Sequence, residues 1–451
     1  MNLRQIVSKL IISVIIGSTI DCSISDTNDK DPEVWITVSS LADFNRKLNR
    51  TIERQIELNW RRVTIDGQHN QWIGLFNENP SNEKLVKSGK NYSIDSINID
   101  LLNNGSYRTY IQFPYKKFSM KNLNNSCLKY WIALIKNKKI IAKNCLKIHP
   151  FWMEKNMAII GNMSLLDLMI PGTHNSGSFD RYDLYEDTLT NKYTLCQDES
   201  IFNQLIYGIR FLDLRIAYDN NNEDKQRVWI VHGPVVMKHT LNSVIQQIKR
   251  FMEMAPKEVI IIDFHRFEKG FAKDELSQQK IRRHHRKVWT ILDKHLLKYL
   301  VPKSMGLRTK LNELIAKNKR IIIGYTSDNY LIDRQYLFPQ TKHLWPNTDI
   351  VNEMVDYFNK TICDVFPGEL VSSMAQLTAE KFKLIIDLYD GLRTMAQNVN
   401  RLITDAFHWD SGMGWTDCAN VVSSDYFLGN NLIDISIKTN LMRSKKQSTV
   451  K

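Results

Sequence analysis

Three segments of the sequence each end an apolar run with a side chain that can move a proton or bind a phosphate. His174 follows the run that ends at Ile170, Asp213 and Arg215 lie within residues 211–216, and His232 closes residues 228–232. Histidine exchanges protons near neutral pH, and a guanidinium binds phosphate oxygens in a forked geometry. Two histidines, a carboxylate and an arginine therefore predict an enzyme that cleaves a phosphodiester without a metal ion.

The elements that must position these residues alternate in type after residue 150. Apolar, strand-like runs are separated by amphipathic stretches such as residues 241–254 and 381–407; the runs are residues 168–170, 211–216, 228–231, 259–264, 320–325 and 421–426. This alternation predicts an α/β fold with a parallel sheet closed as a TIM-type barrel, regular or distorted. In such barrels catalytic side chains gather at the carboxyl ends of the strands, where His174, His232 and Asp425 are expected.

The chain of 451 residues is too long for one ordinary core, and its character changes near residue 150. Before that point, short alternating or aromatic runs are separated by Asn, Gly, Pro and Lys clusters, which predicts an all-β sandwich. We expect a signal peptide over residues 1–22, a β-sandwich over 30–150, a barrel over 151–440 and a basic tail over 441–451.

The N-terminus predicts secretion, because Arg4 and Lys9 precede an uncharged run of signal-peptide length; a retained anchor is the alternative. Six cysteines fit an oxidising compartment. Cys127–Cys145 is expected to close a hairpin, Cys363–Cys418 is a second candidate pair, and the pairing of Cys22 and Cys196 stays open. Glycosylation sequons agree weakly with secretion and lie at Asn49, Asn91, Asn104, Asn124, Asn162 and Asn359.

The formal net charge of +13 favours anionic partners, either nucleic acid or an anionic lipid headgroup. The longest basic cluster, residues 282–287, lies in a helical stretch and is interpreted as a solvated helix face. No zinc-finger spacing or RNA-binding signature is found in the sequence, so a nucleic-acid partner is not expected.

The segment PGTHNSG at residues 171–177 and the segment HGP at residues 232–234 resemble the X domain of phosphatidylinositol-specific phospholipases C. The resemblance extends over residues 162–425 and is strongest to the small X-domain-only, metal-independent type. The N-terminal sandwich would be an addition to that domain. The resemblance implies a phosphoric diester hydrolase of lipid metabolism. Such an enzyme would act on phosphatidylinositol or a glycosyl-phosphatidylinositol at a membrane surface.

Roles follow from this resemblance. His174 matches the general base that takes the proton of the inositol 2-hydroxyl, and His232 matches the general acid that protonates the leaving glycerol oxygen. Asp425 matches the carboxylate that orients the base. The products would be diacylglycerol and an inositol phosphate, formed through a cyclic phosphate.

Arg215 indicates whether the site binds a calcium ion. It stands where the calcium-dependent relatives need an acidic ligand, and a Ca²⁺ ion prefers about six to eight oxygens. We therefore expect no metal and no cofactor, with Arg215 holding the phosphate. Asn175 departs from the bacterial pattern, which has an Asp there that assists the acid histidine and the arginine. Asp213 could take over this assisting role. Asn175, Asp263 and His265 are expected to bind substrate. Asp263 and His265 would line the pocket, although His265 could equally be structural.

Two alternatives to an enzyme remain open. One is an inositol-lipid-binding module with decayed catalysis, which Asn175 makes conceivable. The other is an adhesion-type protein whose sandwich carries the function. Among enzymes, the glycerophosphodiester class is a remote alternative, because its members need acidic metal ligands that residues 173–176 lack. The sequence predicts no oligomeric state.

Overall fold

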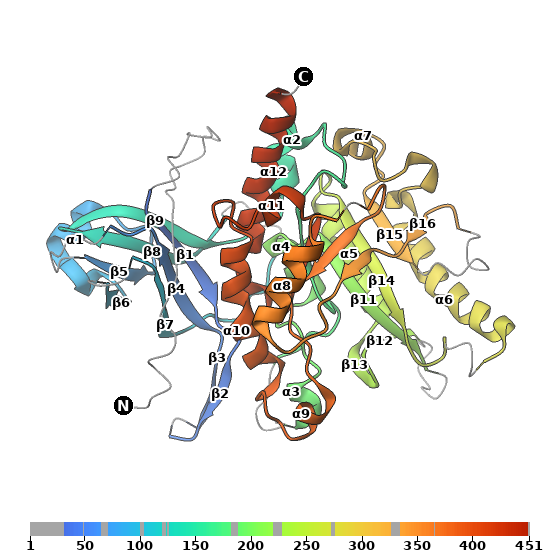
Figure 1. Cartoon of the computed structure of the whole chain (residues 1–451), viewed down its shortest axis with the longest axis horizontal. Coiled ribbons are helices and arrows are strands. Elements are labelled where there is room, and N and C mark those ends of the chain that lie inside the picture. The colour runs from blue at the N-terminus through green and yellow to red at the C-terminus, as the bar shows by residue number, and fades with distance from the viewer. Residues whose placement is uncertain are drawn as a thin grey trace. The chain divides into compact units, whose positions relative to one another are not determined.

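The computed structural model divides the chain into two compact units, which are described separately (Figure 1). One comprises Met1–Ile148 with Leu428–Asn431, and the other comprises His149–Phe427 with Leu432–Lys451. The structure describes residues 31–449 except 48, 65–70, 100–102, 120–122, 124–125, 182–187, 220–227, 272–275, 326–333 and 365. The expected signal peptide, Cys22 and Asn124 lie outside these residues. None of the helices within them is long and apolar enough to cross a membrane.

The first unit is built from antiparallel sheets. One has the strand order β1-β4-β7, the other has the order β6-β5-β8-β9, and β2 and β3 form a separate hairpin. The strands are β1 (Glu33–Val38), β2 (Ala42–Asn45), β3 (Arg50–Glu53), β4 (Gln55–Arg61), β5 (Gln71–Phe76), β6 (Asp95–Asn98), β7 (Gly105–Gln112), β8 (Cys127–Lys136) and β9 (Lys139–Lys147). Helix α1 (Asn82–Ser88) covers part of one sheet. The prediction of a strand-rich N-terminal region is confirmed.

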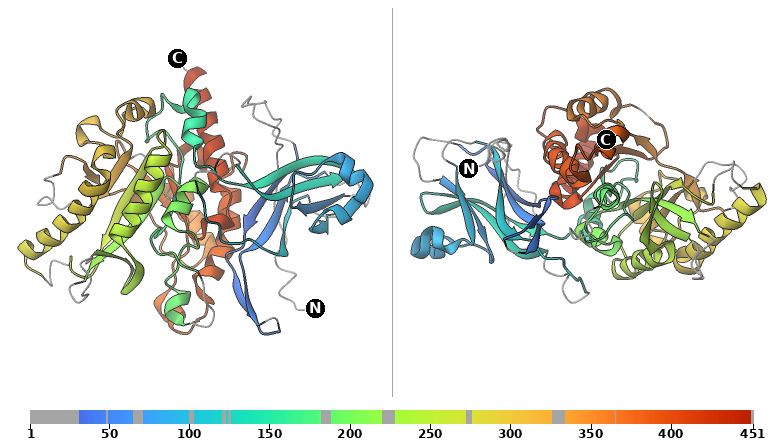
Figure 2. Two further views of the ribbon diagram at one scale, coloured as in Figure 1. Left: turned by 180° about the vertical axis from the view of Figure 1, so that it is seen from behind. Right: turned by 90° about the horizontal axis from the view of Figure 1, so that it is seen from below.

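The second unit contains a curled parallel sheet with the order β16-β15-β14-β11-β10-β19-β18-β17 (Figure 2). Its strands are β10 (Ile170–Thr173), β11 (Phe211–Tyr218), β14 (Ile260–Phe267), β15 (Ile321–Tyr325), β16 (Leu337–Pro339), β17 (Lys342–Leu344), β18 (Val371–Met374) and β19 (Val421–Ser424). The segment 337–344 pairs with β15 through β16 and with β18 through β17, so it joins the two edges of the sheet. The predicted α/β fold with a distorted barrel is confirmed.

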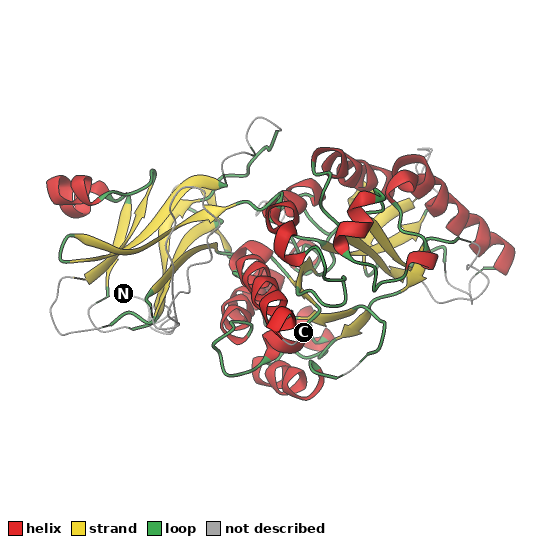
Figure 3. Ribbon diagram, turned by 90° about the horizontal axis from the view of Figure 1, so that it is seen from above, coloured by secondary structure: helices red, strands yellow, loops and turns green. Residues whose placement is uncertain are grey.

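Helices surround this sheet, as Figure 3 shows. They are α2 (Trp152–Ile160), α3 (Leu189–Lys192), α4 (Ile201–Tyr207), α5 (Leu241–Met254), α6 (Gln278–Leu296), α7 (Leu311–Ala316), α8 (Val351–Thr361), α9 (Lys381–Ile385), α10 (Gly391–Ala406), α11 (Trp415–Cys418) and α12 (Leu432–Thr449). Helix α5 buries Val244, Ile248 and Phe251 along one side, which is the spacing expected of a helix that packs on a sheet.

Two expectations about single elements are wrong. Residues 228–232 form β12 (Val228–His232), which runs antiparallel to β11 and makes a hairpin with β13 (Val235–Thr240) instead of joining the parallel strands. Residues 381–407 are not one helix. Asp387, Asp390 and Gly391 have positive φ values of 52°, 54° and 84°, and this left-handed backbone separates α9 from α10.

Other segments refine the sequence interpretation. Residues 441–449 of the expected basic tail are part of α12. The basic cluster lies in α6, where His284 and His285 are buried while Arg283, Arg286 and Lys287 are exposed, so only part of it is a solvated face. Both expected disulfides, Cys127–Cys145 and Cys363–Cys418, are present within the described residues.

A buried ion pair holds the amino-terminal side of the barrel. Arg210, just before β11, and Glu258, just before β14, lie 2.7 Å apart, and both side chains are fully buried. Glu258 also accepts from the backbone N–H groups of Met153 and Glu154 at the start of α2. Further Arg210 N–H groups donate to backbone carbonyls, including that of Pro150. The pair therefore ties α2 to two neighbouring strands.

Candidate active site

The turn after β10 is the centre of the candidate site. Asn175 has a φ of 42°, so the chain turns sharply directly after His174. Gly177 lies close to Ile230, because an added Cβ would be 2.6 Å from that side chain. The turn is held to β11, since the Ser176 N–H donates to the Asp213 carbonyl at 2.8 Å. These contacts fix where the His174 side chain begins.

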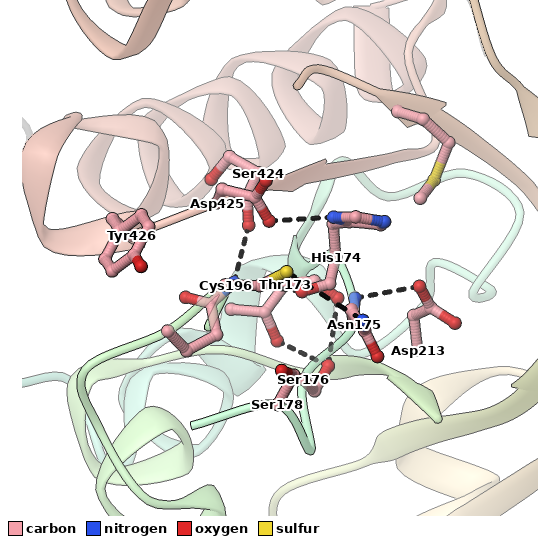
Figure 4. Close-up of polar contacts among 12 residues, drawn as sticks. Thr173, His174, Asn175, Ser176, Ser178, Cys196, Asp213, Ser424, Asp425 and Tyr426 are labelled. Atoms are coloured by element: carbon pink, nitrogen blue, oxygen red, sulfur yellow. Dashed lines mark hydrogen bonds and ion pairs between the residues drawn. The ribbon is translucent and has the colours of Figure 1, made fainter. Parts of the chain in front are cut away.

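His174 and Asp425 form a close pair. Nδ1 of His174 lies 2.7 Å from Oδ1 of Asp425, and both residues are buried (Figure 4). They meet because β10 pairs in parallel with β19, and each residue follows its strand. Gln197 supports the pair by donating to the carbonyls of His174 and Ser424 at 3.0 and 2.9 Å.

Arg215 contacts the other nitrogen of the same ring. Its Nη2 lies 2.7 Å from Nε2 of His174 and 3.5 Å from Oδ2 of Asp213. A guanidinium can only donate, so Nε2 must accept and Nδ1 must carry the proton that it shares with Asp425. The free site therefore holds a neutral His174 whose lone pair faces Arg215.

Asp213 supplies negative charge beneath this arrangement. It is fully buried, and its Oδ2 accepts from the Asn175 N–H at 2.8 Å (Figure 4). Burial opposes ionisation of this carboxyl, but the positive charge of Arg215 and the nearby imidazoles outweigh it and hold the pKa of Asp213 below its usual value. A carboxylate is thus available next to Arg215.

His232 reaches the site from the β12–β13 hairpin. Gly233 and Pro234 form its two-residue turn, because His232 pairs with Val235. Nδ1 of His232 donates to the Thr194 carbonyl at 2.6 Å, so Nε2 is the ring nitrogen that this hydrogen bond does not use. Burial and the charge of Arg215 lower the pKa of His232 to about 4, so the ring is neutral at pH 7 in the free protein.

The segment 194–197 contributes contacts that the sequence did not single out. Cys196 is the cysteine outside a disulfide among the described residues, and it is buried. Its Sγ lies 3.8 Å from Nδ2 of Asn175 and 3.7 Å from Nδ1 of His232. Burial raises the pKa of this thiol well above its usual value, so it packs as a neutral group. The segment has no helical or strand period that would have pointed to it.

Asp263 and His265 lie on β14, beside β11, and Asp263 is in register with Asp213. Oδ1 of Asp263 accepts from the Thr341 N–H at 2.8 Å. His265 stacks on His343 of β17 with ring centroids 3.6 Å apart. His343 was missed from the sequence because its strand has three residues and no recognisable pattern.

Comparisons with known proteins place this domain. Residues 169–324 match the family model described as "Phosphatidylinositol-specific phospholipase C, X domain". The chain is 24% identical over 295 residues to PI-PLC X domain-containing protein 1 of Danio rerio, covering 61% of this chain and 91% of that protein. It is 26% identical over 314 residues to PI-PLC X domain-containing protein 2 of Mus musculus, covering 63% of this chain and 85% of that protein.

A bacterial relative matches over a shorter stretch. The 1-phosphatidylinositol phosphodiesterase of Listeria monocytogenes is 36% identical over 111 residues, which are 25% of this chain and 31% of that protein. A solved structure of the Staphylococcus aureus phosphatidylinositol-specific phospholipase C aligns with a TM-score of 0.47 at 17% identity, covering 65% of this chain and 97% of that one. The family model and the X-domain relatives therefore support an X domain of the phosphatidylinositol-specific phospholipase C type at residues 169–324.

The side chains around Asp213 do not fit the calcium ion of the calcium-dependent relatives. Oδ1 of Asn175 and Oδ1 of Asp213 are buried oxygens without a hydrogen-bond partner in the described part of the chain. Next to them stands the guanidinium of Arg215, whose charge repels a cation. Two oxygens fall far short of the roughly six to eight that Ca²⁺ prefers.

Proposed function

We propose that this protein is a metal-independent phosphodiesterase that cleaves phosphatidylinositol, or the same headgroup in a glycosyl-phosphatidylinositol. The observation that carries the proposal is the contact of one histidine with both a carboxylate and a guanidinium: His174 lies 2.7 Å from Asp425 and 2.7 Å from Arg215. A neutral imidazole oriented by a carboxylate is a general base, and a guanidinium beside it is a phosphate-binding group.

In the proposed reaction, Nε2 of His174 takes the proton of the inositol 2-hydroxyl. The oxygen attacks phosphorus, the bond from phosphorus to the glycerol oxygen breaks, and a cyclic inositol phosphate forms. Asp425 stabilises the imidazolium that results. His232 gives a proton to the glycerol oxygen, so diacylglycerol leaves as a neutral alcohol. Each proton transfer is typically worth about 10²–10⁴-fold in rate.

Arg215 has to exchange partners when substrate binds. Its Nη2 donates to His174 in the free protein, and a bound phosphate oxygen would take that hydrogen bond and release the lone pair of the base. Asp213 keeps the guanidinium in place from the other side, at 3.5 Å. This contact supports the idea that Asp213 replaces the acidic residue expected at the position of Asn175.

The low pKa of His232 bears on its role as the acid. The charge of Arg215 is one cause of that pKa of about 4. A bound phosphate anion would offset this charge, so the pKa of His232 would rise in the complex with substrate. The acid would then be charged mainly when its substrate is present.

A membrane-facing surface is also part of the proposal. Four side chains around α9 are more than half exposed although they are large and apolar: Phe382, Ile385, Ile386 and Leu388. Lys192 of α3 binds Asp387 at 2.7 Å, so the end of this segment is tied to α3. Helix α3 follows β10 and α9 follows β18, so both lie in loops after carboxyl ends of strands, as His174 does. Exposed apolar side chains gathered on one segment suit a lipid surface.

We further propose that the protein is secreted and acts peripherally at membranes. The Cys127–Cys145 and Cys363–Cys418 disulfides support an oxidising compartment. Mass spectrometry of the protein from culture medium would test this, because secretion predicts a mature N-terminus beyond the apolar run that ends near Ile20.

The enzymatic proposal is tested by incubating the full chain with phosphatidylinositol vesicles in a chelator and measuring water-soluble inositol phosphate. We expect release by the wild type, and about 10²–10⁴-fold slower release by His174→Ala and His232→Ala. Arg215→Met should lose about 10²–10³-fold. Arg266→Met, on the neighbouring strand β14, is the matched control and should retain activity. A second arm uses a glycosyl-phosphatidylinositol-anchored substrate.

Two results would contradict the proposal. If no inositol phosphate appears while His174→Ala binds vesicles as well as wild type, the chain is a lipid-binding module. If activity appears only when calcium is added, the metal-independent mechanism is wrong.

A further inference from the structure

Three side chains beside the proposed catalytic group form a second cluster. Asp263 and His265 come from β14, and His343 comes from β17. Oδ2 of Asp263 lies 3.6 Å from Nδ1 of His265 and 3.3 Å from Nε2 of His343. One carboxylate oxygen and two imidazole nitrogens therefore lie within 4.8 Å of one another.

These same three atoms are among the buried side-chain atoms of the described residues that make no hydrogen bond, and they contact one another only at ion-pair distances. Oδ2 of Asp263, Nδ1 of His265 and Nε2 of His343 are buried and have no hydrogen-bond partner among the residues that the structure describes. The side chain of Asp263 is fully buried and that of His343 is 7% exposed. Buried polar atoms rarely stay unpaired, because each costs roughly 1–3 kcal/mol. Three such atoms within 4.8 Å of one another favour a ligand that completes the cluster.

Two of the three separations are close to the ligand–ligand edges of a metal coordination shell, and the third is within 4.8 Å. Zinc binds imidazole nitrogen and carboxylate oxygen at about 2.0–2.2 Å, so neighbouring ligand atoms of a tetrahedral site lie about 3.3–3.5 Å apart. The two separations from Asp263, 3.3 and 3.6 Å, are close to this value. The rings of His265 and His343 are nearly parallel at 7°, so they would have to tilt for both lone pairs to face the ion.

Neighbouring residues orient the carboxylate toward the two rings. Oδ1 of Asp263 accepts from the Thr341 N–H at 2.8 Å, which leaves Oδ2 for the cluster. Gly324 of β15 makes room, because a Cβ added there would lie 2.2 Å from Oδ1. Support of this kind around ligands is a common feature of metal sites.

We propose that Asp263, His265 and His343 bind a borderline divalent transition metal such as Zn²⁺, in place of the substrate contact expected for the first two residues. Two nitrogens and one oxygen suit zinc and its neighbours, whereas Ca²⁺ and Mg²⁺ require mainly oxygen. The fourth position is open to water, and the side chain of His265 is 22% exposed, which gives solvent a path to the ion. This proposal does not depend on the catalytic one.

The test uses metal-stripped full-length protein titrated with ZnCl₂, followed by calorimetry and by metal content after gel filtration. A titration with Co²⁺ adds a visible absorption spectrum that reports tetrahedral coordination. We expect stoichiometric binding by the wild type and its loss in His343→Gln and Asp263→Asn. His408→Gln, which removes a histidine paired with Asp410 elsewhere, is the matched control and should bind as wild type does.

The outcomes separate this site from a competing one. His174, Cys196 and Asp425 also bring ligand atoms close together, so loss of binding in Cys196→Ser would place the ion there and overturn the proposal. Absence of stoichiometric binding by the wild type, or unchanged binding by the Asp263 and His343 variants, would also overturn it. If Asp263→Asn does not fold, as judged by circular dichroism, the more exposed His265→Gln decides the result.

Discussion

Nη2 of Arg215 donates a hydrogen bond to Nε2 of His174 at 2.7 Å, and this contact defines the resting state of the site. Because the guanidinium cannot accept, the imidazole is neutral and its remaining proton points at Asp425. The ring is thus in the tautomer that a general base needs before any substrate arrives. In the proposed mechanism, substrate phosphate and His174 would compete for the same guanidinium, so phosphate binding would release the lone pair of the base.

Asp425→Asn should lower kcat by about 10²–10⁴-fold with little change in KM. An amide can donate to Nδ1 and so favour the wrong tautomer of His174, and it stabilises an imidazolium poorly. Initial rates on phosphatidylinositol vesicles measure the effect. Asp417→Asn, whose carboxylate pairs with Lys446 at the surface, is the control and should behave as wild type. A rate for Asp425→Asn within a few-fold of wild type would rule out this role.

His232 should titrate far below an ordinary histidine, with a pKa of about 4. As the pH falls below about 6.5, the unfolded chain takes up this proton before the folded one does, so folding stability is lost between about pH 6.5 and 4. The shift corresponds to up to about 3 kcal/mol. Urea denaturation of wild type and His232→Gln over this range should show a shallower pH dependence in the variant.

The cause of the shift can be tested separately. Arg215→Met removes one of the positive charges that lower the pKa of His232, so the NMR titration of the ring should move to higher pH. An unchanged midpoint would leave burial as the sufficient explanation.

Cys196 should be inert in the folded protein. Burial raises its pKa, so little thiolate forms near neutral pH and reagents cannot reach it. In a Cys22→Ser background, Ellman's reagent should detect no thiol under native conditions and one after denaturation in urea. Rapid native modification would mean that the segment 194–197 opens readily.

Phe382→Ser and Ile385→Ser should each weaken binding to anionic vesicles by about 10-fold, because each side chain loses apolar area that lipid would cover. Hydrolysis of a water-soluble inositol phosphodiester should stay unchanged. Val86→Ser removes an equally exposed apolar side chain from the first unit and serves as the control. Equal vesicle binding by all three variants would exclude α9 as the docking element.

Glu258→Gln should destabilise the second unit by about 3–5 kcal/mol, because the charge of Arg210 would be left buried without its partner. Denaturant unfolding measures the change. Glu313→Gln breaks a surface pair with Lys317 and should cost less than about 1 kcal/mol. If both variants lose a similar amount of unfolding free energy, the buried pair stabilises the protein no more than a surface pair does.

Long periodic elements were predictable from the sequence. Residues 241–254 form helix α5 with the expected bounds, and the run 211–216 lies within β11. Their apolar spacing is strong because a full side of each is buried. Strands β16, β17 and β18 were not predicted, since three or four residues carry no period. The antiparallel course of β12 follows from its turn and its partner strand, which local pattern does not reveal.

The candidate site shows the same division. His174, Arg215 and Asp425 were singled out by residue type and resemblance, and the structure brings them into contact. His343 was not singled out, and Cys196 was named only as a cysteine of open pairing, because the contacts of each are with residues distant in the chain. Their positions depend on which strands and loops meet, and no single stretch of sequence encodes that.

The pairing of β10 with β19 has a consequence for how the protein is made. His174 and Asp425 are 251 positions apart, so a ribosome adding about 5–20 residues per second needs roughly 12–50 seconds between them. During that interval the edge of β10 that later pairs with β19 leaves backbone N–H and C=O groups without their strand partner. Nascent chains are therefore expected to need chaperone protection late in synthesis, and chains that stop before Val421 cannot close the barrel.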